Sequence, residues 1–116
     1  MTAVTLYHNP RCSKSRATLA LLAERDIDFS VVEYLQQPLS IDELKALATR
    51  LDVGIRDIMR SGEAVYKELN LADPSVSDDD LLAAMVQHPI LMQRPIVVNG
   101  DKARIGRPPE DVLAIV

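Results

Sequence analysis

The first 34 residues predict a strand, a helix and a second strand, and this order constrains the fold more than any other feature. We expect a strand at 4–7 (Val-Thr-Leu-Tyr), a helix at 13–24 and a second strand at 29–34 (Phe-Ser-Val-Val-Glu-Tyr). Because a helical crossover returns the chain to the end of the sheet where it started, the two strands should be parallel. The pattern therefore indicates an α/β fold.

The middle of the chain predicts a helical insertion at about 39–90. Ser40 and Glu43 have the spacing of a capping box, and Gly54 is expected as the C-cap glycine of the helix that follows. Short helical segments are expected at 55–59 and around 65–71, before a helix that Ser77 caps. The core faces of the two longer helices are predicted to be Leu44, Leu47, Ala48 and Leu51, and Leu81, Leu82, Met85 and Val86.

The last part of the chain returns to strand patterns. Residues 95–98 and 102–105 predict two strands joined by a tight turn at Asn99-Gly100. Pro108-Pro109 predicts the start of a final helix, since proline is favoured in the first turn. The whole chain of 116 residues is then a single domain of βαβ, helical insertion and ββα, with a mixed four-stranded sheet.

The charge and cysteine content exclude several classes of protein. A net charge of -4 argues against binding to nucleic acids or to membrane surfaces. No apolar run is long enough to span a bilayer, and the N-terminus does not resemble a signal peptide. One cysteine forms neither an internal disulfide nor a multi-cysteine zinc site. We therefore expect a cytoplasmic protein, most simply a monomer, without a bound metal.

That single cysteine, Cys12, stands directly before the predicted helix at 13–24. Unpaired N–H groups and the positive end of the helix dipole favour a thiolate there, so the sulfur should be nucleophilic. Arg11 and Lys14 add positive charge and are candidates for binding an anionic substrate; they could equally be surface charges of the helix. A lone cysteine is more often a small buried apolar residue, but its position at a helix start favours a reactive one.

Two Arg-Pro pairs, at Arg94 and at Arg107, bracket the predicted hairpin. Guanidinium groups bind tetrahedral oxyanions through two parallel hydrogen bonds, so both arginines are candidates for substrate binding. Ser15 stands where a second cysteine would complete a C-x-x-C motif. An oxidised or substituted Cys12 must therefore be resolved by a thiol from outside the chain.

Residues 7–15, Tyr-His-Asn-Pro-Arg-Cys-Ser-Lys-Ser, closely resemble the active-site segment of the glutaredoxin-dependent arsenate reductase family, the ArsC/Spx group. The resemblance is closest to its short YfgD-like subgroup and implies a thioredoxin/glutaredoxin-like fold. Further segments that resemble family signatures cover the rest of the chain: 66–71, 88–91, 94–98 and 106–108.

The resemblance also implies roles for individual residues. Cys12 would be the nucleophile, His8 would support its reactivity, and Ser15 would hydrogen-bond the thiolate. His8 could also be structural, and Arg60 could simply end a helix. The positions that match the oxyanion-binding arginines and the cis-proline beside the cysteine are Arg60, Arg94, Arg107 and Pro95.

The function that the resemblance implies is the reduction of arsenate to arsenite through a Cys12 adduct. Glutathione would be the co-substrate, glutaredoxin the partner, and no cofactor would be bound. Two alternatives remain open: a glutathione-dependent thiol oxidoreductase with another substrate, and an Spx-like regulator that is not an enzyme.

Overall fold

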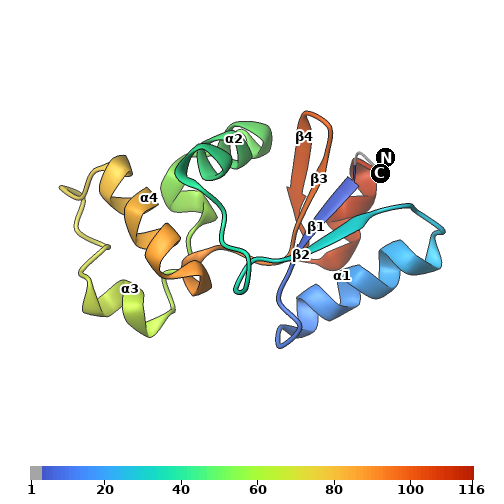
Figure 1. Ribbon diagram of the computed structural model, residues 1–116, viewed down its shortest axis with the longest axis horizontal. Coiled ribbons are helices and arrows are strands. Elements are labelled where there is room, and N and C mark those ends of the chain that lie inside the picture. The colour runs from blue at the N-terminus through green and yellow to red at the C-terminus, as the bar shows by residue number, and fades with distance from the viewer. Residues whose placement is uncertain (1–3) are drawn as a thin grey trace. The chain divides into compact units, whose positions relative to one another are not determined.

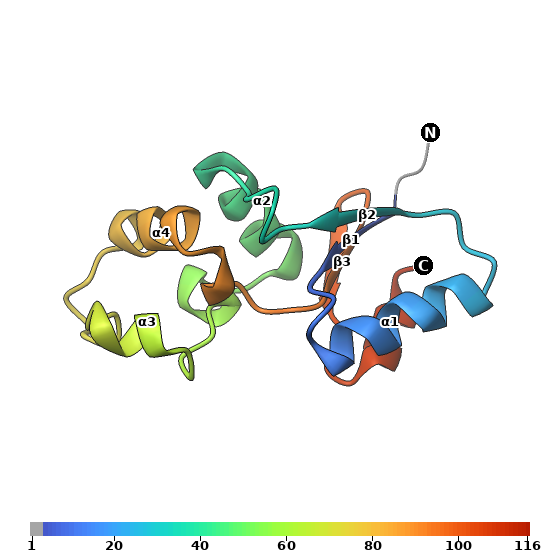
Figure 2. The same cartoon turned by 60° about the horizontal axis from the view of Figure 1, so that its bottom comes forward.

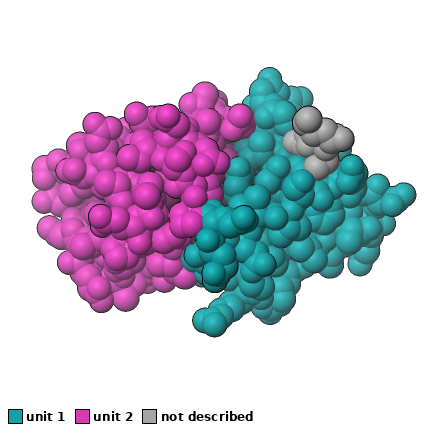
Figure 3. Space-filling model, in the orientation of Figure 1, with its two compact units in different colours: residues 1–37, 94–116 teal, residues 38–93 magenta. Residues whose placement is uncertain are grey.

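A four-stranded mixed sheet forms in the computed structural model, which describes residues 4–116. The chain divides into two units (Figure 3): a sheet unit, residues 1–37 and 94–116, and a helical unit, residues 38–93. The helical unit contains the helices predicted for the insertion at about 39–90; the single-domain organisation stays a prediction. The prediction that no signal peptide is present rests partly on residues 1–3, which lie outside the described residues.

The strand order in the sheet is β2-β1-β3-β4 (Figure 1). The central strand β1 is parallel to β2 and antiparallel to β3, and β3 is antiparallel to β4. This arrangement confirms the predicted α/β fold and its mixed four-stranded sheet. The bounds are β1 Val4–His8, β2 Ser30–Glu33, β3 Ile96–Asn99 and β4 Lys102–Ile105.

Two helices cover one face of the sheet (Figure 2): α1, Ser13–Glu24, and η3, Pro109–Ala114. The second was predicted as a helix without a type and is a 3-10 helix. Alternate residues of β1 point toward these helices, as expected for a strand with one buried face. The core between sheet and helices consists of Val4, Leu6, Leu22, Val97, Val112 and Ile115.

The buried side of α1 is partly polar. Ser15 and Thr18 are fully buried together with Leu22, whereas Leu19 is only partly buried. The Thr18 hydroxyl donates a hydrogen bond to the carbonyl oxygen of Lys14 (3.0 Å), which offsets the cost of burying it. The first two turns of α1 therefore bury polar side chains, and Ser15 packs against the loop that precedes the helix.

The helical unit contains five helical segments. Ser40 and Glu43 form the predicted capping box at the start of α2, and Ser77 accepts a hydrogen bond from the Asp80 N–H at the start of α4. In α4 the predicted core face is correct except that Ala84 is buried and Val86 is only half-buried. The bounds are α2 Ile41–Leu51, η1 Ile55–Ile58, α3 Ala64–Glu68, α4 Asp78–Gln87 and η2 Pro89–Leu91.

The predicted role of Gly54 as a C-cap is wrong. Asp52 ends α2 in the left-handed conformation (φ 59°), which a short polar side chain tolerates. Gly54 has a φ of −78° and instead precedes η1, where its N–H donates to the Asp57 carboxylate (3.0 Å). The hairpin turn begins one residue later than the predicted Asn99-Gly100. Asn99 still belongs to β3 and pairs with Lys102, so the turn starts at Gly100, which has a φ of 62°.

None of the helices within residues 4–116 has the length and apolar character that crossing a membrane requires.

Gly106 follows β4 at a point of close approach. A Cβ atom there would lie 2.7 Å from the Pro95 Cγ and 2.7 Å from the Thr18 Oγ1, closer than non-bonded atoms normally come. The N–H of Gly106 donates to the carbonyl oxygen of Pro95 (2.9 Å). The missing side chain therefore lets the segment that carries Arg107 pack against both α1 and the start of β3.

We predict that Gly106→Ala destabilises the protein by about 1–3 kcal/mol, because the methyl group overpacks this contact. Urea unfolding of the wild type and the variant measures the difference. Gly62→Ala is the matched control, since a Cβ at Gly62 meets nothing within 4 Å, and should change the stability by less than about 0.5 kcal/mol. Equal stabilities for the two variants would contradict the close approach.

Candidate active site

The candidate site lies at one edge of the sheet unit. The parallel strands β1 and β2 end at this edge, and β3 begins there because it is antiparallel to β1. The loop after β1 leads to Cys12, Arg94 precedes β3, and Arg107 follows β4. The topology therefore brings together three segments that are far apart in sequence, and they carry three of the predicted site residues.

Cys12 is the N-cap residue of α1, with extended backbone angles (φ −93°, ψ 123°). Its N–H donates to the Asn9 carbonyl oxygen (3.0 Å), which closes the turn, and its own carbonyl accepts the first helical bond from Arg16 (3.0 Å). The thiol is partly exposed. This position turns the sulfur toward the N–H groups of the first turn, as the sequence predicts.

Both predicted Arg-Pro arginines of the sheet unit lie beside the sulfur. Arg107 donates from Nη2 to the Cys12 Sγ (3.6 Å) and from Nε to the Arg94 carbonyl oxygen (2.8 Å). The Arg94 side chain also acts as a hydrogen-bond donor toward the sulfur. The Arg94–Pro95 and Arg107–Pro108 peptide bonds are both cis, the first as the family resemblance implies.

The surroundings of Cys12 favour its charged form. Burial is the largest influence and acts to raise the pKa of the thiol, but several groups outweigh it. In decreasing order these are the Ser15 N–H, the Arg94 side chain, the Lys14 N–H and the charge of Arg107. The net result is a pKa below the ordinary value for cysteine, which increases the fraction of thiolate near neutral pH.

His8 and Ser15 form a buried pair next to the cysteine loop. The His8 Nδ1 lies 2.6 Å from the Ser15 Oγ, which also accepts the Asn9 N–H (3.0 Å). Burial lowers the pKa of His8, Glu33 acts to raise it and Arg16 lowers it, with a net decrease that favours the neutral ring. The Ser15 hydroxyl thus holds His8 and the loop, while the Ser15 N–H is the group that favours the thiolate.

The other basic residues of the loop differ in what they contact. Arg16 donates to the Pro10 carbonyl oxygen (2.9 Å) and so ties the loop to the helix. The Arg11 N–H donates to the Asn9 Oδ1 (3.0 Å), while the side chains of Arg11 and Lys14 are exposed. Their role in substrate binding stays a prediction.

Arg60 belongs to the helical unit. Its Nε forms an ion pair with the Glu63 carboxylate (3.1 Å), and its N–H donates to the Leu91 carbonyl oxygen (2.7 Å). Its predicted role in oxyanion binding therefore stays a prediction.

Tyr34 is a neighbour of the site that the sequence pattern did not single out. It follows β2 directly and is fully buried. Burial raises the pKa of its hydroxyl, against the opposing influence of Arg94 and Asn9. Its position in the sequence could have indicated this. Tyr34 ends the predicted strand at 29–34, which was expected to run parallel to the strand that leads to Cys12.

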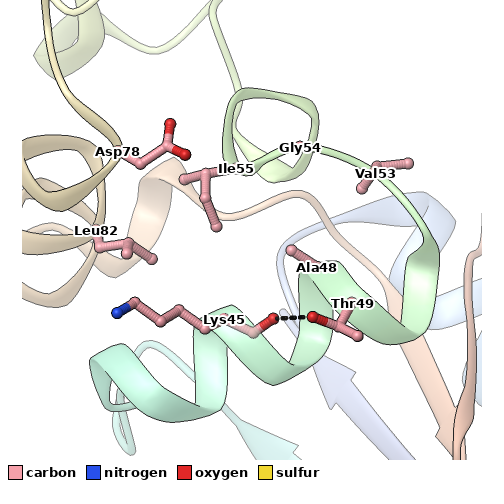
Figure 4. Close-up of a pocket in the computed structure, with 8 residues that line it drawn as sticks. All are labelled: Lys45, Ala48, Thr49, Val53, Gly54, Ile55, Asp78 and Leu82. Carbon is pink, nitrogen blue, oxygen red and sulfur yellow. Dashed lines mark hydrogen bonds between the residues drawn. The ribbon is translucent and has the colours of Figure 1, made fainter.

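Each unit contains a cavity. In the sheet unit, a cavity of about 330 Å³ is lined by Arg11, Glu33, Gln36 and neighbouring residues of the same two segments. In the helical unit, a cavity of about 380 Å³ lies between α2, α4 and the start of η1, with Lys45 and Asp78 in its lining (Figure 4). None of the predicted site residues lines the second cavity. Within residues 4–116, His, Cys, Asp and Glu form no group that could hold a metal ion.

Comparison with known proteins assigns the family. Residues 7–115 match the model of the ArsC family. The chain belongs to the ArsC family. An Escherichia coli K12 relative, the uncharacterized protein YfgD, is 55% identical over 97% of this chain and 96% of its own. A Haemophilus influenzae relative named arsenate reductase is 48% identical over 98% and 99% of the two chains.

Solved structures of the ArsC family support the fold. The structure described as arsenate reductase from Vibrio cholerae has a TM-score of 0.95 and 54% identity, covering 97% of each chain. A structure described as a putative arsenate reductase from Yersinia pestis has a TM-score of 0.93 and 55% identity, covering 97% of this chain and 99% of that one. The predicted family and fold are therefore confirmed.

We predict that Arg107→Gln raises the pKa of the Cys12 thiol, because it removes a positive charge whose Nη2 lies 3.6 Å from the sulfur. The pH dependence of alkylation by iodoacetamide measures this change. Arg104→Gln removes an exposed arginine from β4 and should leave the profile unchanged. If both variants gave the wild-type profile, Arg107 would not stabilise the thiolate.

Proposed function

We propose that this member of the ArsC family is an arsenate reductase in which Cys12 is the nucleophile. The observation that carries the proposal is the sulfur at the N-terminus of α1, with Arg94 and Arg107 both directed at it. Relatives 45–48% identical over nearly the whole chain are named arsenate reductases, which supports arsenate as the anion.

The same groups that stabilise the thiolate suit a tetrahedral oxyanion. Guanidinium groups donate in pairs to oxyanion oxygens, and the first-turn N–H groups of α1 add donors without a charge. We propose that Arg94 and Arg107 hold the arsenate against the sulfur, and that Arg60 contributes as the third arginine of the family pattern. Arg11 and Lys14 would attract the anion toward the loop by their charge.

The first chemical step is substitution at arsenic. The Cys12 sulfur attacks, an S–As bond forms, and one oxygen leaves as water after protonation, so arsenic stays in the +5 state. The two arginines stabilise the charge that builds up on the remaining oxygens. Loss of one such donor is expected to lower the rate on the order of 100- to 1000-fold.

The reducing electrons come from thiols outside the chain, since the sequence has one cysteine. We propose that a glutathione thiolate attacks the Cys12 sulfur of the adduct. A disulfide forms, the S–As bond breaks, and arsenic keeps the electron pair and leaves as arsenite in the +3 state. A glutaredoxin thiol then attacks the mixed disulfide and regenerates the Cys12 thiol. No bound cofactor is needed.

A glutathione-dependent thiol oxidoreductase is the second candidate. A cysteine of lowered pKa at a helix N-terminus also suits thiol–disulfide exchange without an oxyanion. The two functions differ in their requirement for arsenate.

We predict that the wild-type protein catalyses arsenate-dependent oxidation of NADPH when it is coupled through glutathione reductase, glutathione and glutaredoxin. Cys12→Ser should abolish this turnover, because serine supplies no thiolate. Omission of glutaredoxin should also stop it, since the mixed disulfide would accumulate. Spectrophotometry of NADPH follows both reactions.

Retention of activity by Cys12→Ser would disprove the proposed nucleophile. Turnover of a glutathione mixed disulfide, without arsenate turnover, would favour the thiol oxidoreductase instead. Competition by phosphate, which has the same tetrahedral shape, distinguishes a specific oxyanion site from incidental reduction.

A further inference from the structure

Tyr34 lies at the active-site edge of the sheet for a topological reason. β1 and β2 are parallel, and His8 is paired with Glu33 at their last positions. The next residues along the two strands, Asn9 and Tyr34, therefore leave the sheet side by side. Asn9 begins the turn that ends at Cys12.

The hydroxyl of Tyr34 is buried without a well-formed hydrogen bond. The residue is 0% exposed, and its hydroxyl oxygen has no hydrogen-bond partner of normal geometry within residues 4–116. A buried hydroxyl in this condition costs free energy, and a phenyl ring would fill the same space without that cost. The hydroxyl therefore requires an explanation beyond packing.

The polar groups that act on this hydroxyl belong to the active site. The Arg94 side chain and the Asn9 side chain both face it as donors, and the Cys12 sulfur is close enough to act on it electrostatically. The Asn9 Oδ1 accepts the Arg11 N–H, so the amide nitrogen is the part of Asn9 left for the phenol. Guanidinium has only donors, so the phenol oxygen can serve Arg94 only as an acceptor.

We propose that Tyr34 is a positioning residue whose phenol oxygen accepts a hydrogen bond from Arg94 and so keeps its guanidinium directed at the Cys12 sulfur. Because the hydroxyl otherwise lacks a hydrogen bond, side-chain conformations of Arg94 that donate to it are favoured. Arg94 is then held between the phenol on its buried side and the sulfur on the other. Tyr34 does not touch the substrate in this account; it acts through Arg94.

Loss of the hydroxyl should make the Arg94 side chain more mobile and weaken its interaction with the Cys12 sulfur. The thiol of Cys12 would lose part of the stabilisation of its charged form, and its pKa would rise. The consequence for turnover rests on the proposed arsenate reductase function: kcat would fall more than KM would rise, because the arginine is needed most where charge builds up on the oxyanion.

Tyr34→Phe tests the proposal, with Tyr66→Phe as the matched control on α3 in the helical unit. We expect Tyr34→Phe to fold and to unfold cooperatively in urea, because the phenyl ring fills the same space. Its iodoacetamide alkylation profile should shift to higher pH, and kcat for arsenate should fall up to about tenfold. Tyr66→Phe should leave both unchanged.

A double-mutant cycle with Arg94→Gln separates positioning from a general structural effect. If Tyr34 acts through Arg94, adding Tyr34→Phe to Arg94→Gln should shift the alkylation profile no further. Additive shifts, or a Tyr34→Phe profile identical to the wild type, would overturn the proposal. The alkylation arm does not need arsenate, so absence of wild-type arsenate turnover would refute the proposed function without touching this result.

Discussion

Stabilisation of negative charge on one sulfur is the interaction on which the rest of the site depends. Burial of Cys12 opposes the thiolate, and it is overcome by backbone N–H groups of α1 together with Arg94 and Arg107. The N–H contribution comes with the helix itself, since the first turn has no internal acceptors for these groups. The guanidinium contribution depends on tertiary structure, because both arginines come from the far end of the chain.

The fold supplies that tertiary structure by placing strand ends at one edge. The parallel crossover delivers Cys12 there, and the antiparallel hairpin of β3 and β4 begins and ends at the same edge. Gly106 permits a close approach to Pro95 and Thr18, and the next residue along is Arg107.

Local patterns predicted most of this fold, and tertiary proximity explains what they missed. The strand and helix periods and the capping box at Ser40 concern neighbouring residues, which a sequence displays directly. Gly54 was misassigned because Asp52 also tolerates a left-handed backbone, so glycine is not required there. The burial of Tyr34 depends on which strands become neighbours, and no local pattern encodes that. The pairing of His8 with Ser15 depends on the path of the loop between β1 and α1, which the strand and helix periods do not describe. The Arg-Pro pairs that bracket the hairpin indicated Arg94 and Arg107 as candidates, and the resemblance to a family added Arg60.

The most direct test of the account is the titration of the Cys12 thiolate in the wild-type protein, followed by its ultraviolet absorbance, with Cys12→Ser as the blank. Because the chain has one cysteine, the signal belongs to a single group. The account predicts a midpoint below that of an ordinary cysteine, which increases the fraction of thiolate near neutral pH. A midpoint at or above the ordinary value would mean that burial outweighs the helix and the arginines, and would contradict the account.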